Sequence, residues 1–324
     1  MTKEKVLALL KSEDDFISGE HISEIIGVSR MAVSSAVKAL RNEGYDITSV
    51  TNRGYRLNSS PDSLSKAEVM SYVEGKREAE IICLESVDST NKRLKEMALE
   101  GKAPDGLVII ANEQTSGRGR LNRSFISLKD KGIYISMIMR PHCSPADAVN
   151  LTAWTAVAVQ RAVKQVSGCE AGIKWVNDLL LGDRKICGIL TEMSIESESG
   201  RVDYCVVGIG VNVNNETEDF PEELRNKAGS LYTFAGRKFK RAELAAALIK
   251  ELDDVRMGFP VKKREYLDYY RNSCTTIGRS VSTETGHGTV LDINEDFSIK
   301  IRFDDGQVRD LFSGEITIDQ GLYR

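Results

Sequence analysis

The pattern of apolar residues changes twice along the chain, and these changes constrain the fold more than any single motif. Short helical stripes occupy the first 57 residues, and apolar strands then alternate with longer helical patterns. From about residue 275 only short strands remain. Since 324 residues are too many for one ordinary core, the chain is expected to form several domains. We predict an α+β chain with domains at residues 1–60, 64–272 and 275–324.

The N-terminal domain has the pattern of a winged helix-turn-helix. Apolar residues at helical spacing predict helices around residues 6–10, 22–26 and 33–40. Ser29 stands where an N-cap of the third helix is expected. Residues 47–57 have the alternation of a hairpin, the wing, whose tip carries Arg53.

Charge is unevenly distributed within this domain. Residues 1–26 hold three basic and six acidic side chains, whereas residues 27–57 hold five basic and two acidic ones. Because phosphate contacts position a protein on DNA and helix side chains read base edges, we expect the third helix and the wing to bind DNA. One module makes few contacts, which favours a dimer. The alternative is a winged helix used for protein contact or as a structural cap. The residues predicted to contact DNA are Ser29, Arg30, Ser34, Ser35, Lys38, Arg41 and Arg53.

Polar segments and the spacing of apolar residues predict the linker and the helices and strands of the other two domains. The polar, proline-containing residues 58–63 predict a linker, after which Ser65 and Glu68 have the spacing of a capping box. In the central domain we predict strands at 107–111, 133–139, 186–191 and 204–211, forming a mixed sheet, and helices at 90–100, 149–166 and 241–256. At the C-terminus, strands at 279–283, 289–293, 298–303 and 308–312 predict a small SH3-like β-barrel.

Composition excludes several classes of function. A net charge of -4 argues against bulk attraction to nucleic acid or membrane, and no apolar run reaches the roughly 18 residues that span a bilayer. Three scattered histidines give little support to a zinc site or a Ser-His-Asp triad. Six cysteines without a CxxC pair indicate a reduced, cytoplasmic protein.

Residues 114–123 combine three arginines with two glycines between apolar, strand-like runs. The planar guanidinium group suits phosphate and carboxylate oxygens, and glycine lets the backbone approach closely. The segment matches neither a Walker loop nor a dinucleotide fingerprint. It predicts a loop that closes over an anion, although a mobile surface segment or a non-specific nucleic-acid contact would use the same residues.

Two other segments carry polar side chains next to predicted strands. Residues 88–91 open a helix, where an anion or a simple N-cap is favoured. Lys174, Trp175 and Asp178 suit a phosphate, an apolar wall and a magnesium ion, and the alternative is a strand followed by an Asn-Asp turn.

The strand that follows also carries a cation. By strand alternation, Lys185 is expected to share one face with Cys187 and Ile189. Gly188 would permit close approach of a ligand.

In this order the segments resemble those of bifunctional biotin–protein ligases of the BirA type, over essentially the whole chain. The matching segments are Asp-Ser-Thr-Asn at 88–91, Gln-x-x-Gly-Arg-Gly-Arg at 114–120, Lys-Trp-x-Asn-Asp at 174–178, Lys-Ile-x-Gly at 185–188, Gly-Ile-Gly-x-Asn at 208–212 and Ser-Gly-Glu at 313–315. The chain departs from the family pattern at Leu121, Asn122, Val176 and Phe125, and the last change bears on the apolar lid over adenine.

The resemblance implies the residues of the active site. Biotin would be bound by Ser89, Thr90, Asn91, Gln114, Gly117, Arg118, Gly119, Arg120, Lys185 and Gly188. ATP would be bound by Arg120, Arg123, Lys174, Trp175, Asn177, Asp178 and Asn212. Lys185 and Arg118 would be catalytic, and Asp178 would hold Mg²⁺.

The resemblance also implies two activities. The chain would form biotinyl-adenylate from biotin and ATP and transfer biotin to a lysine of the biotin carboxyl carrier protein of acetyl-CoA carboxylase. It would also bind operator DNA as a homodimer when adenylate-bound, repressing genes of biotin synthesis or transport. A non-catalytic biotin-sensing repressor and a lipoate-type acyl ligase are the alternatives.

Overall fold

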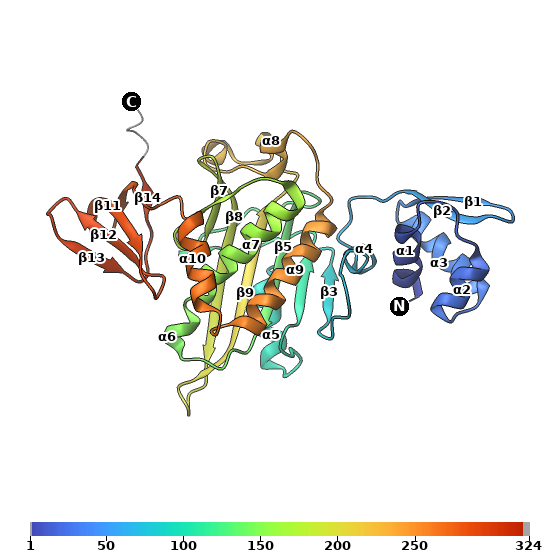
Figure 1. Ribbon diagram of the computed structural model, residues 1–324, viewed down its shortest axis with the longest axis horizontal. Helices are drawn as coiled ribbons and strands as arrows, with labels where there is room; N and C mark the ends of the chain where they lie inside the picture. Colours follow the sequence, from blue (N-terminus) through green and yellow to red (C-terminus); the bar gives the residue numbers. More distant parts are fainter. Residues whose placement is uncertain (1, 320–324) are drawn as a thin grey trace.

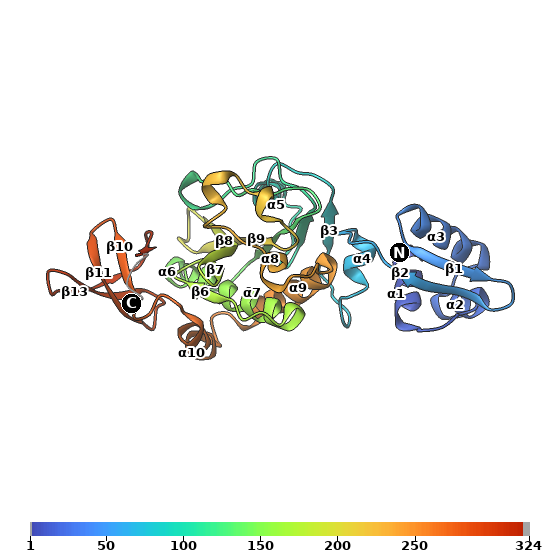
Figure 2. The same ribbon diagram turned by 90° about the horizontal axis from the view of Figure 1, so that it is seen from above.

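The computed structural model describes residues 2–319, which form three folded parts in a row (Figures 1 and 2). The N-terminal helices and hairpin lie at one end of the long axis, and the C-terminal strands lie at the other. The layered central part stands between them. The predicted class, an α+β chain with a winged helix, a mixed central sheet and a small C-terminal β domain, is confirmed.

The N-terminal part is a winged helix-turn-helix. Its elements are α1 (Thr2–Ser12), α2 (Gly19–Ile26), α3 (Arg30–Asn42), β1 (Asp46–Val50) and β2 (Gly54–Ser59). Ser29 caps α3 by accepting a hydrogen bond from the Ala32 amide, as predicted. Val33, Val37 and Leu40 of α3 are fully or almost fully buried, so their helical spacing turns one face inward and leaves the other in solvent.

The central part is built on a seven-stranded mixed sheet. The strands are β3 (Ile81–Leu84), β4 (Val108–Ala111), β5 (Gly132–Met139), β6 (Gly172–Lys174), β7 (Asp178–Leu181), β8 (Arg184–Ile195) and β9 (Val202–Asn212). They lie in the order β3-β4-β5-β9-β8-β7-β6, with β3 and β4 parallel and the other neighbours antiparallel. The two longest strands, β8 and β9, therefore lie side by side in the interior of the sheet.

Helices cover both faces of this sheet. They are α4 (Lys66–Met70), α5 (Thr90–Leu99), α6 (Pro145–Ala148), α7 (Leu151–Ser167), α8 (Leu231–Ala235), α9 (Arg241–Gly258) and α10 (Lys263–Ser273), with short 3-10 turns at Arg120–Asn122, Thr217–Asp219 and Glu222–Leu224. Alternate residues of β5 point to opposite faces. Ile135 and Met137 join the core under α7 and α9, whereas Ile138 packs with Leu94 of α5. The face that carries α5 also carries the polar Ser136.

The C-terminal part is a five-stranded antiparallel sheet. Its strands are β10 (Ser280–Thr283), β11 (Gly286–Ile293), β12 (Ile299–Phe303), β13 (Val308–Leu311) and β14 (Thr317–Ile318), in the order β13-β12-β11-β10-β14. Over residues 2–319, no pairing joins the edge strands β13 and β14 into a closed ring. The short β14 was not predicted. The Trp175 indole N–H donates to the Phe297 carbonyl at 2.8 Å, so this sheet shares its core with the central part.

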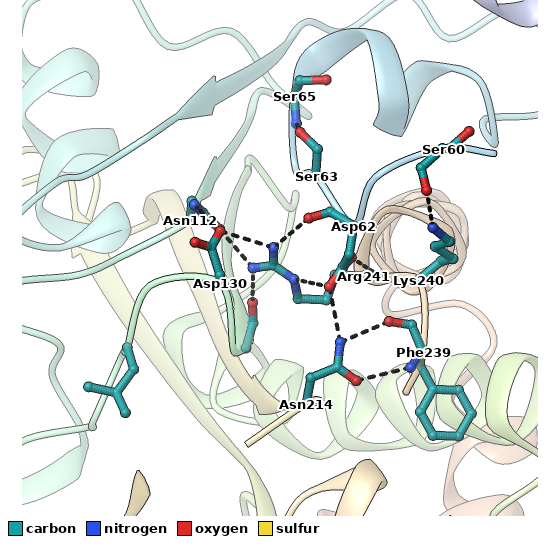
Figure 3. A network of polar contacts seen from close by, with 12 residues as sticks. Ser60, Asp62, Ser63, Ser65, Asn112, Asp130, Asn214, Phe239, Lys240 and Arg241 are labelled. Carbon is teal, nitrogen blue, oxygen red and sulfur yellow. Dashed lines mark hydrogen bonds and ion pairs between the residues drawn. The ribbon is translucent and has the colours of Figure 1, made fainter. Parts of the chain in front are cut away.

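The predicted linker, residues 58–63, is held by a buried arginine at the start of α9. The Arg241 side chain is 0 % exposed, and its Nε donates to Asp62 Oδ2 at 2.9 Å. Figure 3 shows this guanidinium group between the linker and two other segments, with Nη1 donating to Asn112 Oδ1 at 2.7 Å and Nη2 lying 3.4 Å from Asp130. Asn214 donates to the same Asp62 carboxylate at 3.0 Å. The polar composition of the linker therefore serves specific contacts.

Only half of the predicted capping box forms at α4. Ser65 accepts from the Glu68 amide at 3.2 Å, but the Glu68 carboxylate does not return to the Ser65 amide, which donates to Ser63. The carboxylate is buried instead and accepts from Lys11 at 2.6 Å and from Tyr45. A buried carboxylate needs such partners, and here the winged helix supplies them. Glu68 thus joins the first two parts of the chain.

Candidate active site

A pocket opens on the α5 face of the central sheet, at the N-terminus of α5. It encloses about 480 Å³ of empty space, part of it open to solvent. Its lining residues are Ser89, Thr90, Asn91, Gln114, Arg118, Gly119, Arg120, Phe125, Asn177, Lys185, Gly188, Ile189, Leu190, Gly208, Ile209 and Gly210. Five of the segments singled out in the sequence therefore meet in one place. Of the ten residues predicted for biotin, nine line this pocket, and the tenth, Gly117, does not.

The base of the pocket is a network of buried polar groups. Gln114 Oε1 accepts from the Thr90 backbone amide at 2.9 Å and lies 3.1 Å from the Thr90 hydroxyl. Ser136 Oγ lies 2.7 Å from Thr90 Oγ1 and 2.6 Å from Asn91 Oδ1. The Asn91 amide nitrogen donates to Glu192 Oε2 at 2.9 Å. These polar groups are paired with one another, so the base is preorganised rather than adaptable.

Two glycines of β9 let side chains lie directly on the sheet. A Cβ atom at Gly208 would stand 2.0 Å from Asn91 Oδ1, and one at Gly210 would stand 2.4 Å from the Phe125 ring. Phe125 also meets Tyr134 edge-on, with ring centroids 6.4 Å apart. The floor of the pocket therefore requires residues without side chains at both positions.

The predicted alternation of β8 is wrong at Lys185. The register between β7 and β8 shifts at Leu179 and Leu180, which gives β8 an extra residue there. A Cβ atom at Gly188 would lie 3.1 Å from Lys185 Nζ, whereas Cys187 is buried in the core on the other face. Burial raises the pKa of the Cys187 thiol far above its ordinary value. The irregularity turns Lys185 into the pocket beside Gly188.

Cations gather at the rim of the pocket. Lys185 Nζ forms an ion pair with Asp178 Oδ1 at 2.6 Å. Burial lowers the pKa of the Lys174 ammonium, and Asp178 nearby opposes this shift. The Arg118 guanidinium is exposed and makes no hydrogen bond or ion pair within the described residues. It is therefore available to an anionic ligand.

The arginine loop is tied to the C-terminal part. Arg120 donates to Asn177 Oδ1 at 3.1 Å and to the Gly314 carbonyl at 3.2 Å, and Arg123 donates to Glu315 Oε2 at 2.6 Å. The tip turns through a left-handed backbone, with φ 52° at Leu121 and 58° at Asn122. Asparagine tolerates this region where another sequence would use glycine, whereas leucine adopts it at a cost.

Six predicted residues do not line the pocket: Arg123, Lys174 and Asp178, and the buried Gly117, Trp175 and Asn212. Gly117 is buried, and a Cβ atom there would stand 2.3 Å from the Phe125 carbonyl oxygen, so it permits the close approach of the two sides of the loop. Trp175 is 4 % exposed and packs in the core rather than forming an open wall. Asn212 is buried and donates to the Gly229 carbonyl at 3.0 Å. Each of these three buried residues supports the site from behind.

A magnesium ion has one carboxylate available at this rim. Within residues 2–319 no group of three or more His, Cys, Asp or Glu side chains is placed to hold a metal. Nucleotide-bound Mg²⁺ needs only one or two protein carboxylates, because phosphates and waters complete its shell. Asp178 fits that limited requirement, and binding the ion would replace its ion pair with Lys185.

Sequence reasoning missed Ser136, Ser127 and Glu192. Ser136 is a small polar residue in a largely apolar strand, which was a usable signal. Ser127 accepts from the Gln114 amide at 2.9 Å, and Glu192 follows the buried part of β8. Nothing local in the sequence distinguishes these two residues from surface residues.

The residues predicted to contact DNA are all exposed on the winged helix. Three of them already have partners inside that domain, because Ser29 caps α3 by accepting from the Ala32 amide. Arg41 donates to the Ile47 carbonyl and holds the wing, and Arg53 pairs with Asp15 at 3.1 Å. Arg30, Ser34, Ser35 and Lys38 remain as exposed side chains of α3.

Comparison with known proteins defines the class of this chain. Residues 83–212 match the model of the Biotin/lipoate A/B protein ligase family, and residues 2–56 match an HTH domain. These matches fall on the sheet that carries the pocket and on the winged helix. The fold and site therefore define a ligase-type domain joined to a helix-turn-helix domain.

Relatives extend over almost the whole chain. The Bifunctional ligase/repressor BirA of Bacillus subtilis is 32 % identical over 327 aligned residues, covering 98 % of this chain and 98 % of that protein. The protein of the same name from Escherichia coli is 29 % identical, covering 97 % and 96 %. The chain belongs to the BirA family of bifunctional ligase/repressors.

A solved structure agrees with this assignment. The biotin protein ligase from Aquifex aeolicus in complex with biotin and ATP superimposes with a TM-score of 0.63 at 27 % identity, covering 75 % of this chain and 99 % of that one. Among the described residues, no helix has both the length and the apolar character that a membrane span requires.

Proposed function

We propose that this chain forms biotinyl-adenylate from biotin and ATP and transfers the biotinyl group to a lysine of a biotin carboxyl carrier protein. We also propose that its winged helix binds operator DNA, as a homodimer when the adenylate is bound, and so represses biotin genes in the cytoplasm. The observation that carries the catalytic part is a polar base whose groups pair with one another, lined above by Arg118 and Lys185, with Lys174 close to Lys185.

The chemical problem is the approach of two anions. The biotin carboxylate must attack the α-phosphorus of ATP, forming a C–O–P linkage while pyrophosphate leaves. Arg118 and Lys185 would screen this repulsion and stabilise the charge that develops on the phosphoryl oxygens. Bound Mg²⁺, held at Asp178, would supply further neutralisation of the phosphates. Neither a protein nucleophile nor a general base is needed at this step.

The second step is acyl transfer. The acceptor lysine amine attacks the carbonyl carbon of the mixed anhydride, and AMP leaves as the amide forms. Because the anhydride also reacts with water, the loop of residues 117–123 would protect it. Its ties to Gly314 and Glu315 support this role, since they hold the loop from outside the pocket.

Biotin-dependent exchange of pyrophosphate into ATP tests the proposal. The wild-type chain should catalyse exchange with biotin and not with lipoate, and mass spectrometry should detect bound biotinyl-adenylate. Lys185→Ala should abolish exchange, whereas Lys164→Ala, at an exposed ion pair on α7, should not. DNA binding without exchange would favour a non-catalytic sensor, and exchange with lipoate alone would favour a lipoate ligase.

A further inference from the structure

The hydrogen bonds at the base of the pocket run in one direction. We propose that Ser136 and Glu192 are positioning residues that fix this direction, so that Thr90 presents only an acceptor to a ligand. The inference rests on the proposed function for the identity of the ligand, biotin. It adds two residues, neither of which was predicted, to those that determine specificity.

The direction begins at Glu192. The Asn91 amide group faces the Glu192 carboxylate at 2.9 Å and the Leu190 carbonyl at 3.2 Å. Both are acceptors only, so the NH₂ end of the amide must point toward them. The oxygen of the same amide, Oδ1, therefore faces Ser136 Oγ at 2.6 Å. Asn91 cannot flip without setting oxygen against oxygen.

The orientation of the Ser136 hydroxyl in turn determines that of the Thr90 hydroxyl. The Ser136 hydroxyl has one proton, and Asn91 Oδ1 cannot donate, so that proton belongs to Asn91. Ser136 Oγ is then an acceptor at 2.7 Å from Thr90 Oγ1, nearer than Gln114 Oε1 at 3.1 Å, and the Thr90 proton goes to one of these two buried acceptors. If Thr90 turned its proton elsewhere, two buried oxygens would meet at this distance without a hydrogen atom. The Ser136 side chain is fully buried, so water does not relieve that contact.

Thr90 consequently faces the pocket with lone pairs alone. Ser89, next to it, accepts from the Lys92 amide at 3.5 Å, and its own proton makes no hydrogen bond within the described residues. An acceptor beside a donor complements the N–H and C=O of a cyclic urea, which biotin carries. A ring with an oxygen atom in place of the urea N–H would set that oxygen against the lone pairs of Thr90, so this arrangement disfavours its binding.

The test compares biotin with its two cyclic carbamate analogues, in each of which one ring N–H is replaced by oxygen. Dissociation constants would be measured by calorimetry for the full-length chain. The wild type should prefer biotin over the analogue whose oxygen faces Thr90. Ser136→Ala removes the shorter of the two contacts that hold the Thr90 proton and leaves only Gln114 Oε1 at 3.1 Å, so Thr90 can turn its proton to the carbamate more easily. This preference should narrow about tenfold, the effect of one buried polar contact.

A second variant disturbs the same chain of hydrogen bonds at Glu192. Glu192→Ala leaves the Asn91 amide held only by the Leu190 carbonyl at 3.2 Å, so the amide can flip more readily, Ser136 can then reverse its hydrogen bond, and the preference for biotin should narrow here too. Lys95→Ala is its matched control, because Lys95 pairs with the other Glu192 oxygen and leaves the Asn91 contact intact. Ser298→Ala removes a buried hydroxyl of the C-terminal sheet and is the control for Ser136→Ala.

The outcomes separate this inference from the proposed function. The inference is supported if the preference for biotin over the carbamate narrows in both variants and in neither control. Equal proportional weakening of biotin and carbamate overturns it, because general damage to the pocket would not change their ratio. A wild type that binds biotin but makes no adenylate overturns the proposed catalysis alone. A wild type that binds neither ligand overturns both.

Discussion

Replacing Asp62 by alanine should destabilise the central part of the molecule, although Asp62 lies in a segment that the sequence marks only as a linker. The Asp62 carboxylate is the nearest counter-ion of Arg241, whose side chain is 0 % exposed. Its other oxygen accepts from the Arg241 backbone amide at 2.9 Å. The substitution would remove the negative charge and leave the buried cation in place.

The size of this destabilisation depends on the hydrogen bonds and ion pairs that Arg241 retains. Removing one partner of a buried ion pair costs about 3–5 kcal/mol. Asp62 is 30 % exposed, so water can reach the vacated position, and Arg241 retains Asn112, the Gly132 carbonyl and Asp130. We therefore expect a loss near the lower limit, about 3 kcal/mol in the free energy of unfolding. Asp62→Asn removes the charge and keeps only one of the two acceptor oxygens, with an NH₂ donor facing N–H donors in place of the other, so it should also destabilise the protein.

Urea denaturation followed by tryptophan fluorescence measures this loss. Both tryptophans of the chain, Trp154 and Trp175, are buried in the central part, so the signal reports its unfolding and not that of the winged helix. Glu170→Ala, which breaks an exposed ion pair with Lys164, is the control and should leave the curve unchanged. A change below about 1 kcal/mol for Asp62→Ala would refute the reasoning, since a buried cation that loses its nearest counter-ion should cost more than that.

Three other predictions concern charges. Lys174→Met should raise the free energy of unfolding at pH 7, because burial lowers the pKa of Lys174 and its buried ammonium group opposes folding. The increase should shrink as the pH rises toward 10.5, where the lysine loses its charge in both states, and urea denaturation at several pH values would reveal this. Glu315→Ala should change the stability by less than about 0.5 kcal/mol, because the pair with Arg123 is exposed, yet speed the release of biotinyl-adenylate; unchanged release in a filter assay would contradict the tie between loop and C-terminal sheet. Arg30→Ala should weaken operator binding by about 1–3 kcal/mol and relax its specificity at one base pair, measured by fluorescence anisotropy on the operator and on single-base variants of it, and unchanged specificity would exclude a base contact.

Local patterns predicted most of the elements of this fold. Helical stripes and strand alternation gave the winged helix and the main central strands, because each pattern is confined to neighbouring residues. Ser29 caps its helix for the same reason. The two-residue β14 was beyond such reasoning, and the barrel predicted for the C-terminal part does not close by strand pairing within the described residues, since short strands depend on the partner that they pair with.

The candidate site divides in the same way. Arg118, Lys185, Thr90 and Gln114 were identifiable because their residue types and spacing carry the chemistry of anion and amide binding. The position of Lys185 beside Gly188 was not, because it depends on a register shift between two strands.

By itself, then, the sequence determined three hydrophobic patterns and a set of cationic and amide side chains in a fixed order. Tertiary structure alone decided which of them meet. Asp62 and Arg241 lie 179 residues apart, and Asn91 and Glu192 lie 101 apart, yet each pair shares a hydrogen bond in a buried or half-buried place. Such contacts depend on the packing of whole elements, because a buried polar group must find its partner wherever the fold brings one close.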